Sequence, residues 1–108
     1  MTKILDFTYR GKPYTIYDVD KIEGKDSYIG ETNYDNGRIL IEIGSRQEMI
    51  DTLKHELAHV WLYENGHKNQ SGDEVFSYED LCEYVALSND SINKVVDEYL
   101  KNKNIDIN

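Results

Sequence analysis

Residues 55 to 59 read His-Glu-Leu-Ala-His, so that two histidines stand four positions apart and a glutamate follows the first. Residues four apart on a helix share one face, and two imidazoles placed in this way can bind one zinc ion. Glu56 is offset by one residue's rotation, so its carboxylate can reach a metal-activated water without being a ligand. The pattern predicts His55 and His59 as metal ligands and Glu56 as the catalytic base. Two ordinary surface histidines are the alternative interpretation.

A helix over about residues 45–65 would carry this pattern. Ser45 and Glu48 have the spacing of a capping box, in which each side chain satisfies a free backbone amide. The apolar residues follow the helical period of 3.6: Ile50, Leu53, Leu57, Val60 and Trp61. His55 and His59 each stand two positions from Leu57, and therefore point roughly 160° from the centre of this apolar stripe. We expect both histidines to face away from the main core.

Two histidines do not complete a catalytic zinc site, which needs a third protein ligand and an open position for water. The downstream candidates are His67, Asp73, Glu74, Glu79, Asp80 and Glu83. Glu79 and Glu83 would share one face of a second helix, predicted over residues 78–101. Glu79 could bind the metal while Glu83 accepts a hydrogen bond from a ligand histidine. On spacing alone, two solvated glutamates are an equally good interpretation.

The first half of the chain predicts a small antiparallel sheet. Residues 4–9 and 14–19 would form one hairpin, and residues 28–32 and 38–43 a second one. The second hairpin would turn at Asn36-Gly37, with both residues at positive φ. The expected fold class is α+β: one domain over residues 1–108, with this sheet packed on the first helix and on a long C-terminal helix that bends near Ser88-Asn89.

Composition restricts the partners. The net charge of -9 disfavours binding to nucleic acids and to anionic membrane surfaces. A single cysteine, Cys82, excludes an intrachain disulfide and fits a reducing compartment. Asp6 interrupts the apolar residues near the N-terminus, so we expect no signal peptide. We expect no membrane span either, because no apolar stretch of the sequence is long enough. These features favour a cytoplasmic protein.

The residues quoted above resemble those of the gluzincins, HEXXH metallopeptidases whose third zinc ligand is a glutamate on the next helix. The second motif of that family is a ligand glutamate followed four residues later by an aspartate. Here Glu79 lies twenty positions after His59, and Glu83 takes the place of the aspartate. The length and the order of elements are similar to minigluzincins, and residues 79–86 resemble a helix of small phage and mobile-element peptidases. The resemblance covers roughly residues 28–99.

The resemblance implies a zinc-dependent peptidase that acts on a protein or peptide substrate. Glu79 would be the third ligand, and Glu83 would hold a ligand histidine by a hydrogen bond. Glu56 would take a proton from the attacking water and deliver it to the leaving amine. An exposed strand at the sheet edge would bind the substrate as an added antiparallel strand. That strand would comprise Arg38, Ile39, Leu40, Ile41 and Glu42.

Three features depart from the family pattern. Glu83 replaces the aspartate, and Tyr78 stands where an asparagine is common. We also expect no counterpart of the C-terminal subdomain from which larger gluzincins place a histidine or tyrosine near the oxyanion. The candidates for that last role are Tyr28, Tyr63, His67 and Tyr84. The alternative function is a catalytically silent or latent protein-interaction module in which zinc acts as a staple. Glu56 favours the enzyme, because a purely structural site does not need it.

Overall fold

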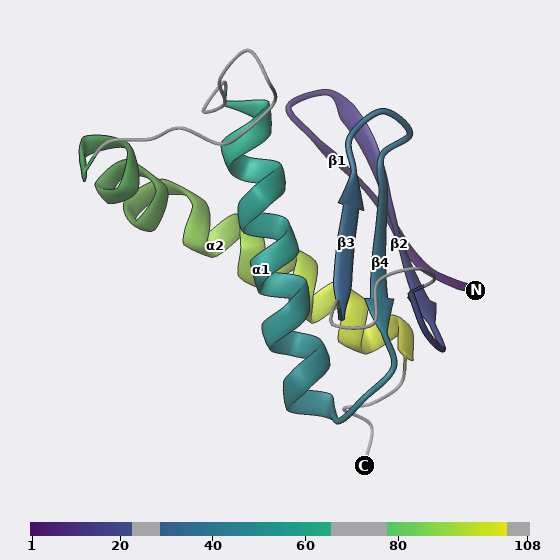
Figure 1. Cartoon of the computed structure of the whole chain (residues 1–108). Coiled ribbons are helices and arrows are strands. Elements are labelled where there is room, and N and C mark those ends of the chain that lie inside the picture. The colour runs from purple at the N-terminus through teal and green to yellow at the C-terminus, as the bar shows by residue number, and fades with distance from the viewer. Residues whose placement is uncertain (23–28, 66–77, 104–108) are drawn as a thin grey trace.

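The computed structural model describes residues 1–22, 29–65 and 78–103, with only the backbone described for residues 78–88. The elements are β1 (Thr2–Tyr9), β2 (Lys12–Val19), β3 (Gly30–Asn33), β4 (Arg38–Glu42), α1 (Arg46–Glu64) and α2 (Tyr78–Lys103). Four strands and two helices confirm the α+β class predicted from the sequence (Figure 1). In the described part of the chain, no helix is both long enough and apolar enough to cross a lipid bilayer.

The strands form one sheet in the order β1-β2-β4-β3. Each hairpin is antiparallel, but β2 pairs with β4 in parallel, from Thr15 beside Arg38 to Val19 beside Glu42. The sheet is therefore mixed and not fully antiparallel as predicted. The physical reason is that the two hairpins meet through their second strands. Turn signals fix the direction of strands within a hairpin but do not determine which strands of two hairpins become neighbours.

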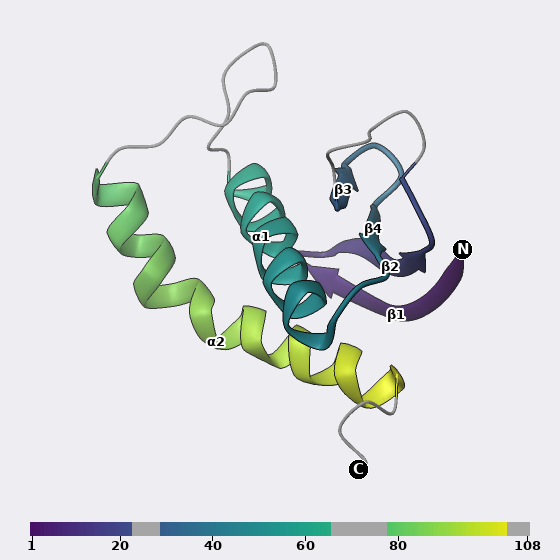
Figure 2. The same cartoon turned by 60° about the horizontal axis from the view of Figure 1, so that its bottom comes forward.

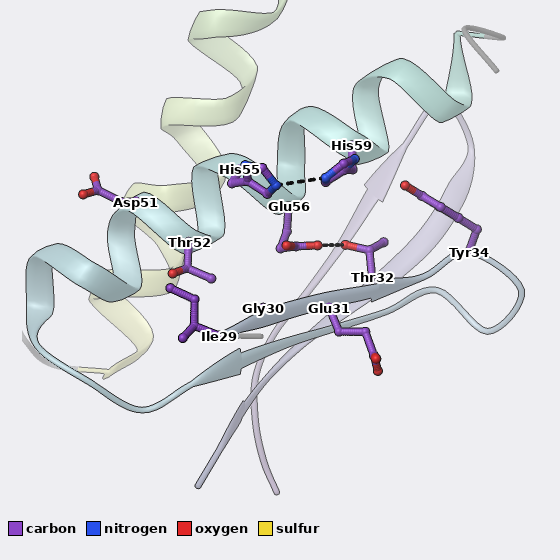
Figure 3. A pocket seen from close by; sticks show the side chains of 10 residues that line it. All are labelled: Ile29, Gly30, Glu31, Thr32, Tyr34, Asp51, Thr52, His55, Glu56 and His59. Carbon is purple, nitrogen blue, oxygen red and sulfur yellow. Dashed lines mark hydrogen bonds between the residues drawn. The ribbon is translucent and has the colours of Figure 1, made fainter. Parts of the chain in front are cut away.

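The turn between β3 and β4 spans four residues, 34–37. Gly37 has a φ of 67°, whereas Asn36 is not at positive φ, so the predicted two-residue turn at Asn36-Gly37 is wrong. The side chain of Asn33 accepts hydrogen bonds from the backbone amides of Asp35 and Asn36, at 3.0 and 3.3 Å. These bonds stabilise a longer loop, and this loop places Tyr34 near α1 (Figure 3).

Both helices lie on one side of the sheet, and α2 is bent along its length (Figure 2). Helix α1 packs on β3 and β4, whereas α2 packs on β1 and on α1. The predicted apolar stripe of α1 is buried throughout: Ile50, Leu53, Leu57, Val60 and Trp61. It meets the inward residues of the sheet and of α2: Leu5, Tyr14, Ile16, Ile39, Ile41, Ile92, Val96, Tyr99 and Leu100. The core therefore fixes α1 by the face opposite to the two histidines.

Helix α1 begins where the capping box predicts. The Ser45 hydroxyl accepts a 3.1 Å hydrogen bond from the Glu48 amide, and the Glu48 carboxylate accepts one of 2.9 Å from the Ser45 amide. These two bonds satisfy backbone amides that have no partner within the helix. The start of the helix is thereby set, and His55 and His59 fall in its regular middle part.

Candidate metal centre

His55 and His59 point out of α1 side by side (Figure 3). Their Nε2 atoms are 3.0 Å apart, and their ring centroids are 4.7 Å apart. Two nitrogens that bind one tetrahedral zinc at about 2.0–2.1 Å lie about 3.3 Å apart, which is close to the observed separation. The pair therefore fits a zinc ion, once both rings carry their proton on Nδ1 and leave Nε2 as a ligand.

Glu56 points from α1 toward Thr32 on β3 (Figure 3). It is only 6% exposed, and its Oε1 accepts a 2.6 Å hydrogen bond from the hydroxyl of Thr32 on β3. One potential ligand atom each from His55, Glu56 and His59 lies within 4.8 Å of the others. The arrangement thus brings a carboxylate next to two converging imidazoles, as the sequence pattern predicted.

A cleft of about 660 Å³ runs between α1 and β3 and contains these groups. The lining residues are Ile29, Gly30, Glu31, Thr32, Tyr34, Asp51, Thr52, His55, Glu56 and His59. Among the described residues that line it there are three carboxylates and neither lysine nor arginine.

The edge of the sheet beside the cleft is β3, not the strand expected from the sequence. Residues Arg38–Glu42 form β4, which pairs with β2 on one side and with β3 on the other. Ile39 and Ile41 point into the core and are fully buried. The prediction of Arg38, Ile39, Leu40, Ile41 and Glu42 as an exposed substrate-binding edge is therefore wrong. A strand with inward isoleucines next to α1 is better placed in the middle of the sheet, and the short polar β3 takes the edge.

The register of β3 shows which of its backbone groups face outward. The amide of Glu42 donates a 3.0 Å hydrogen bond to the carbonyl of Ile29, and Gly30 stands opposite Ile41. In an antiparallel pair, residues alternate between bonding the partner strand and facing away from it. It follows that the backbone N–H and C=O groups of Gly30 and Thr32 face the outer edge. Among the described strands, none pairs with that edge.

Gly30 allows β3 to approach α1 closely. A Cβ atom at this position would lie 2.5 Å from Cγ2 of Thr52 and 2.9 Å from Oε2 of Glu56. Both distances are shorter than ordinary Cβ contacts, so a side chain at this position would force Thr52, Glu56 or the strand itself to shift. The glycine thereby brings the edge strand within hydrogen-bonding reach of Glu56.

Glu79 and Glu83 fall in the first turns of α2, but their side chains lie outside the described residues, as does that of Tyr84. The same holds for the side chain of Asp80, and the remaining ligand candidates, His67, Asp73 and Glu74, lie outside the described residues together with Tyr28. Their predicted roles remain predictions. Tyr63 does not line the cleft; its ring stacks on that of Tyr34, with centroids 4.0 Å apart.

Sequence reasoning missed Thr32 and Tyr34, both of which line the cleft. The signal for Thr32 is the alternation of β3: Figure 3 shows Glu31 pointing away from α1, whereas Thr32 points toward Glu56. This alternation identifies Thr32 as a cleft residue only when it is known which face of the sheet packs against α1. Tyr34 is the first residue of the turn after β3, and the packing of this turn on α1, where Tyr34 stacks on Tyr63, brings it to the cleft.

Compared with protein-family models, curated proteins and solved structures, the chain has no match in any of the three.

Proposed function

We propose that this chain is a zinc-dependent peptidase. The observation that carries the proposal is the convergence of His55 and His59, with Nε2 atoms 3.0 Å apart, beside the buried carboxylate of Glu56. A zinc staple needs only its ligands and does not require a carboxylate that stays outside the ligand set. A hydrolase needs that carboxylate as a base.

His55 and His59 would hold zinc through Nε2, and Glu79 would complete the three protein ligands as the resemblance to gluzincins suggests. Glu83 would accept a hydrogen bond from a ligand histidine and fix its orientation. When bound, zinc would supply the Lewis acidity that lets a water molecule react near neutral pH. The side chains and backbone of the protein itself would transfer the protons and orient the peptide.

Glu56 would accept the proton of the water as the water oxygen attacks the scissile carbonyl carbon. It would then deliver this proton to the nitrogen as the C–N bond breaks, which leaves a carboxylic acid and an amine. The peptide would lie antiparallel to β3 and use the outward backbone groups of Gly30 and Thr32. Such pairing would lay an extended chain through the cleft beside the two histidines.

The test is cleavage of a fluorogenic peptide library by the zinc-loaded protein, beside a Glu56→Gln variant. The amide keeps the size of the carboxylate but cannot take up the proton. We expect the variant to keep its zinc and fold and to lose at least a hundredfold in kcat/KM, because a general base typically contributes about 10²–10⁴ in rate.

A wild-type protein that binds zinc but cleaves none of the peptides would overturn the peptidase proposal. If its melting temperature then fell sharply on adding a chelator, the zinc-stapled interaction module would be the better interpretation. Equal cleavage by wild type and Glu56→Gln would show that Glu56 is not the base.

A further inference from the structure

The contact between Thr32 and Glu56 joins the edge strand to the buried carboxylate. The Thr32 hydroxyl donates to Oε1 of Glu56 across 2.6 Å, from a residue 24 positions earlier in the chain. Hydrogen bonds to an ionised carboxylate are short and about twice as strong as those between neutral groups. This bond fixes one oxygen of a side chain that has three rotatable bonds and would otherwise sample several rotamers.

The same residue faces the outer edge of the sheet with its backbone. Its side chain is directed to α1, while its N–H and C=O groups are directed to the side where an added strand would pair. A peptide bound on β3 would therefore contact the backbone of the residue that holds the base. Since β3 has only four residues, this pairing would also restrain the position of Thr32 itself.

We propose that Thr32 is a positioning residue, which holds the Glu56 carboxylate in its reactive orientation and couples peptide pairing on β3 to that orientation. The inference rests on the proposed peptidase function. A misplacement of a reacting group by about 1 Å costs about a hundredfold in rate, so even a small release of Glu56 affects the chemical step. Peptide binding by the backbone of β3 does not need the hydroxyl.

The kinetic test compares Thr32→Val, Thr32→Ser and Thr15→Val in the zinc-loaded protein. Thr15 is a matched control, because its hydroxyl also donates to a carboxylate, Asp6, at 2.7 Å on the exposed side of the sheet. We expect Thr32→Val to lower kcat about ten- to a hundredfold with little change in KM and with zinc content unchanged. Thr32→Ser should restore most of kcat, and Thr15→Val should match wild type.

A second test needs no activity and is carried out on the metal-free protein in EDTA. A double-mutant cycle in urea unfolding combines Thr32→Val with Glu56→Ala. With Glu56 present, we expect Thr32→Val to raise the unfolding equilibrium constant about tenfold, because a buried carboxylate loses a partner. In the Glu56→Ala background the same substitution should change it less than threefold.

The outcomes separate the two proposals. If wild type cleaves peptides and Thr32→Val does so with an unchanged kcat, the positioning role is wrong and the peptidase stands. A fall in kcat that Thr32→Ser does not rescue, or a cycle without coupling, also contradicts this role. If wild type cleaves no peptide, the peptidase proposal and the inference that rests on it both fail.

Discussion

The hydroxyl of Tyr99 on α2 donates a 2.6 Å hydrogen bond to Oδ1 of Asp18 on β2, 81 residues away in the sequence. The other carboxylate oxygen of Asp18 pairs with Nζ of Lys103 at 2.6 Å. All three side chains lie in or at the edge of the core. This network fastens the C-terminal half of α2 to the sheet, and α2 is the helix on which Glu79 stands.

Tyr99→Phe should therefore lower the free energy of unfolding by about 1–3 kcal/mol, because the substitution leaves a buried carboxylate oxygen without its donor. Urea denaturation measures this change. Tyr17→Phe is the control, since Tyr17 stands on the opposite face of β2. We expect the control to change stability by less than about 0.5 kcal/mol. Equal effects of the two substitutions would contradict the role of the network.

Alkaline pH should destabilise the fold through two buried tyrosines. Burial, and then a hydrogen bond to Asp18, raises the pKa of Tyr99 well above its usual value. Burial, and then a hydrogen bond to Glu64, does the same to the pKa of Tyr14. Because the folded-state pKa exceeds the unfolded one, this stabilisation is complete below about pH 10 and is lost as the pH rises above it.

The measurement is the urea midpoint at a series of pH values from 8 upward, to about 11.5, together with tyrosine absorbance at each pH. Wild type should lose stability above about pH 10, and Tyr99→Phe should lose it less steeply. A wild-type curve parallel to that of Tyr99→Phe would show that Tyr99 ionises normally in the folded protein.

Zinc content should depend on Glu79 and not on Glu83. We expect one zinc per chain by elemental mass spectrometry, lost in His55→Ala and in Glu79→Ala. Glu83→Ala should keep zinc with an affinity about 10–100-fold lower, as is typical for the partner of a ligand histidine. Glu98→Ala, near the C-terminal end of α2, is the control, because it removes a carboxylate from the same helix. Full zinc binding by Glu79→Ala would move the third ligand to another downstream residue.

Gly30→Ala should disturb the site by steric overlap. The new methyl group would meet Cγ2 of Thr52 at 2.5 Å and Oε2 of Glu56 at 2.9 Å. We expect a loss of about 1–3 kcal/mol in unfolding free energy, as for other overpacked positions, and a lower kcat from a displaced Glu56. Urea denaturation and peptide cleavage measure the two effects.

Thr52→Ser provides the compensating change, because it removes Cγ2 and keeps the hydroxyl that donates to the Glu48 carbonyl at 2.8 Å. In the double variant, part of the lost stability should return. A Gly30→Ala protein as stable and active as wild type would show that β3 moves away from α1 at little cost.

The sequence alone determined α1 and the direction of its functional side chains. Ser45 and Glu48 form their capping bonds within one turn, and the 3.6-residue period places His55 and His59 opposite the Leu57 stripe. These are local relationships along one helix, so their geometry follows from spacing. The two hairpins and the α+β class were also predictable, because short-range turn and periodicity signals define them.

Only the tertiary structure decided how the hairpins meet and which strand borders the cleft. The parallel pairing of β2 with β4 depends on packing between segments far apart in the sequence, and it moves residues 38–42 from the edge to the interior. The contact of Thr32 with Glu56 depends on the same arrangement, together with the close approach at Gly30. Spacing cannot predict such contacts, because the free energy that selects them comes from burying the inner face of the sheet against both helices at once.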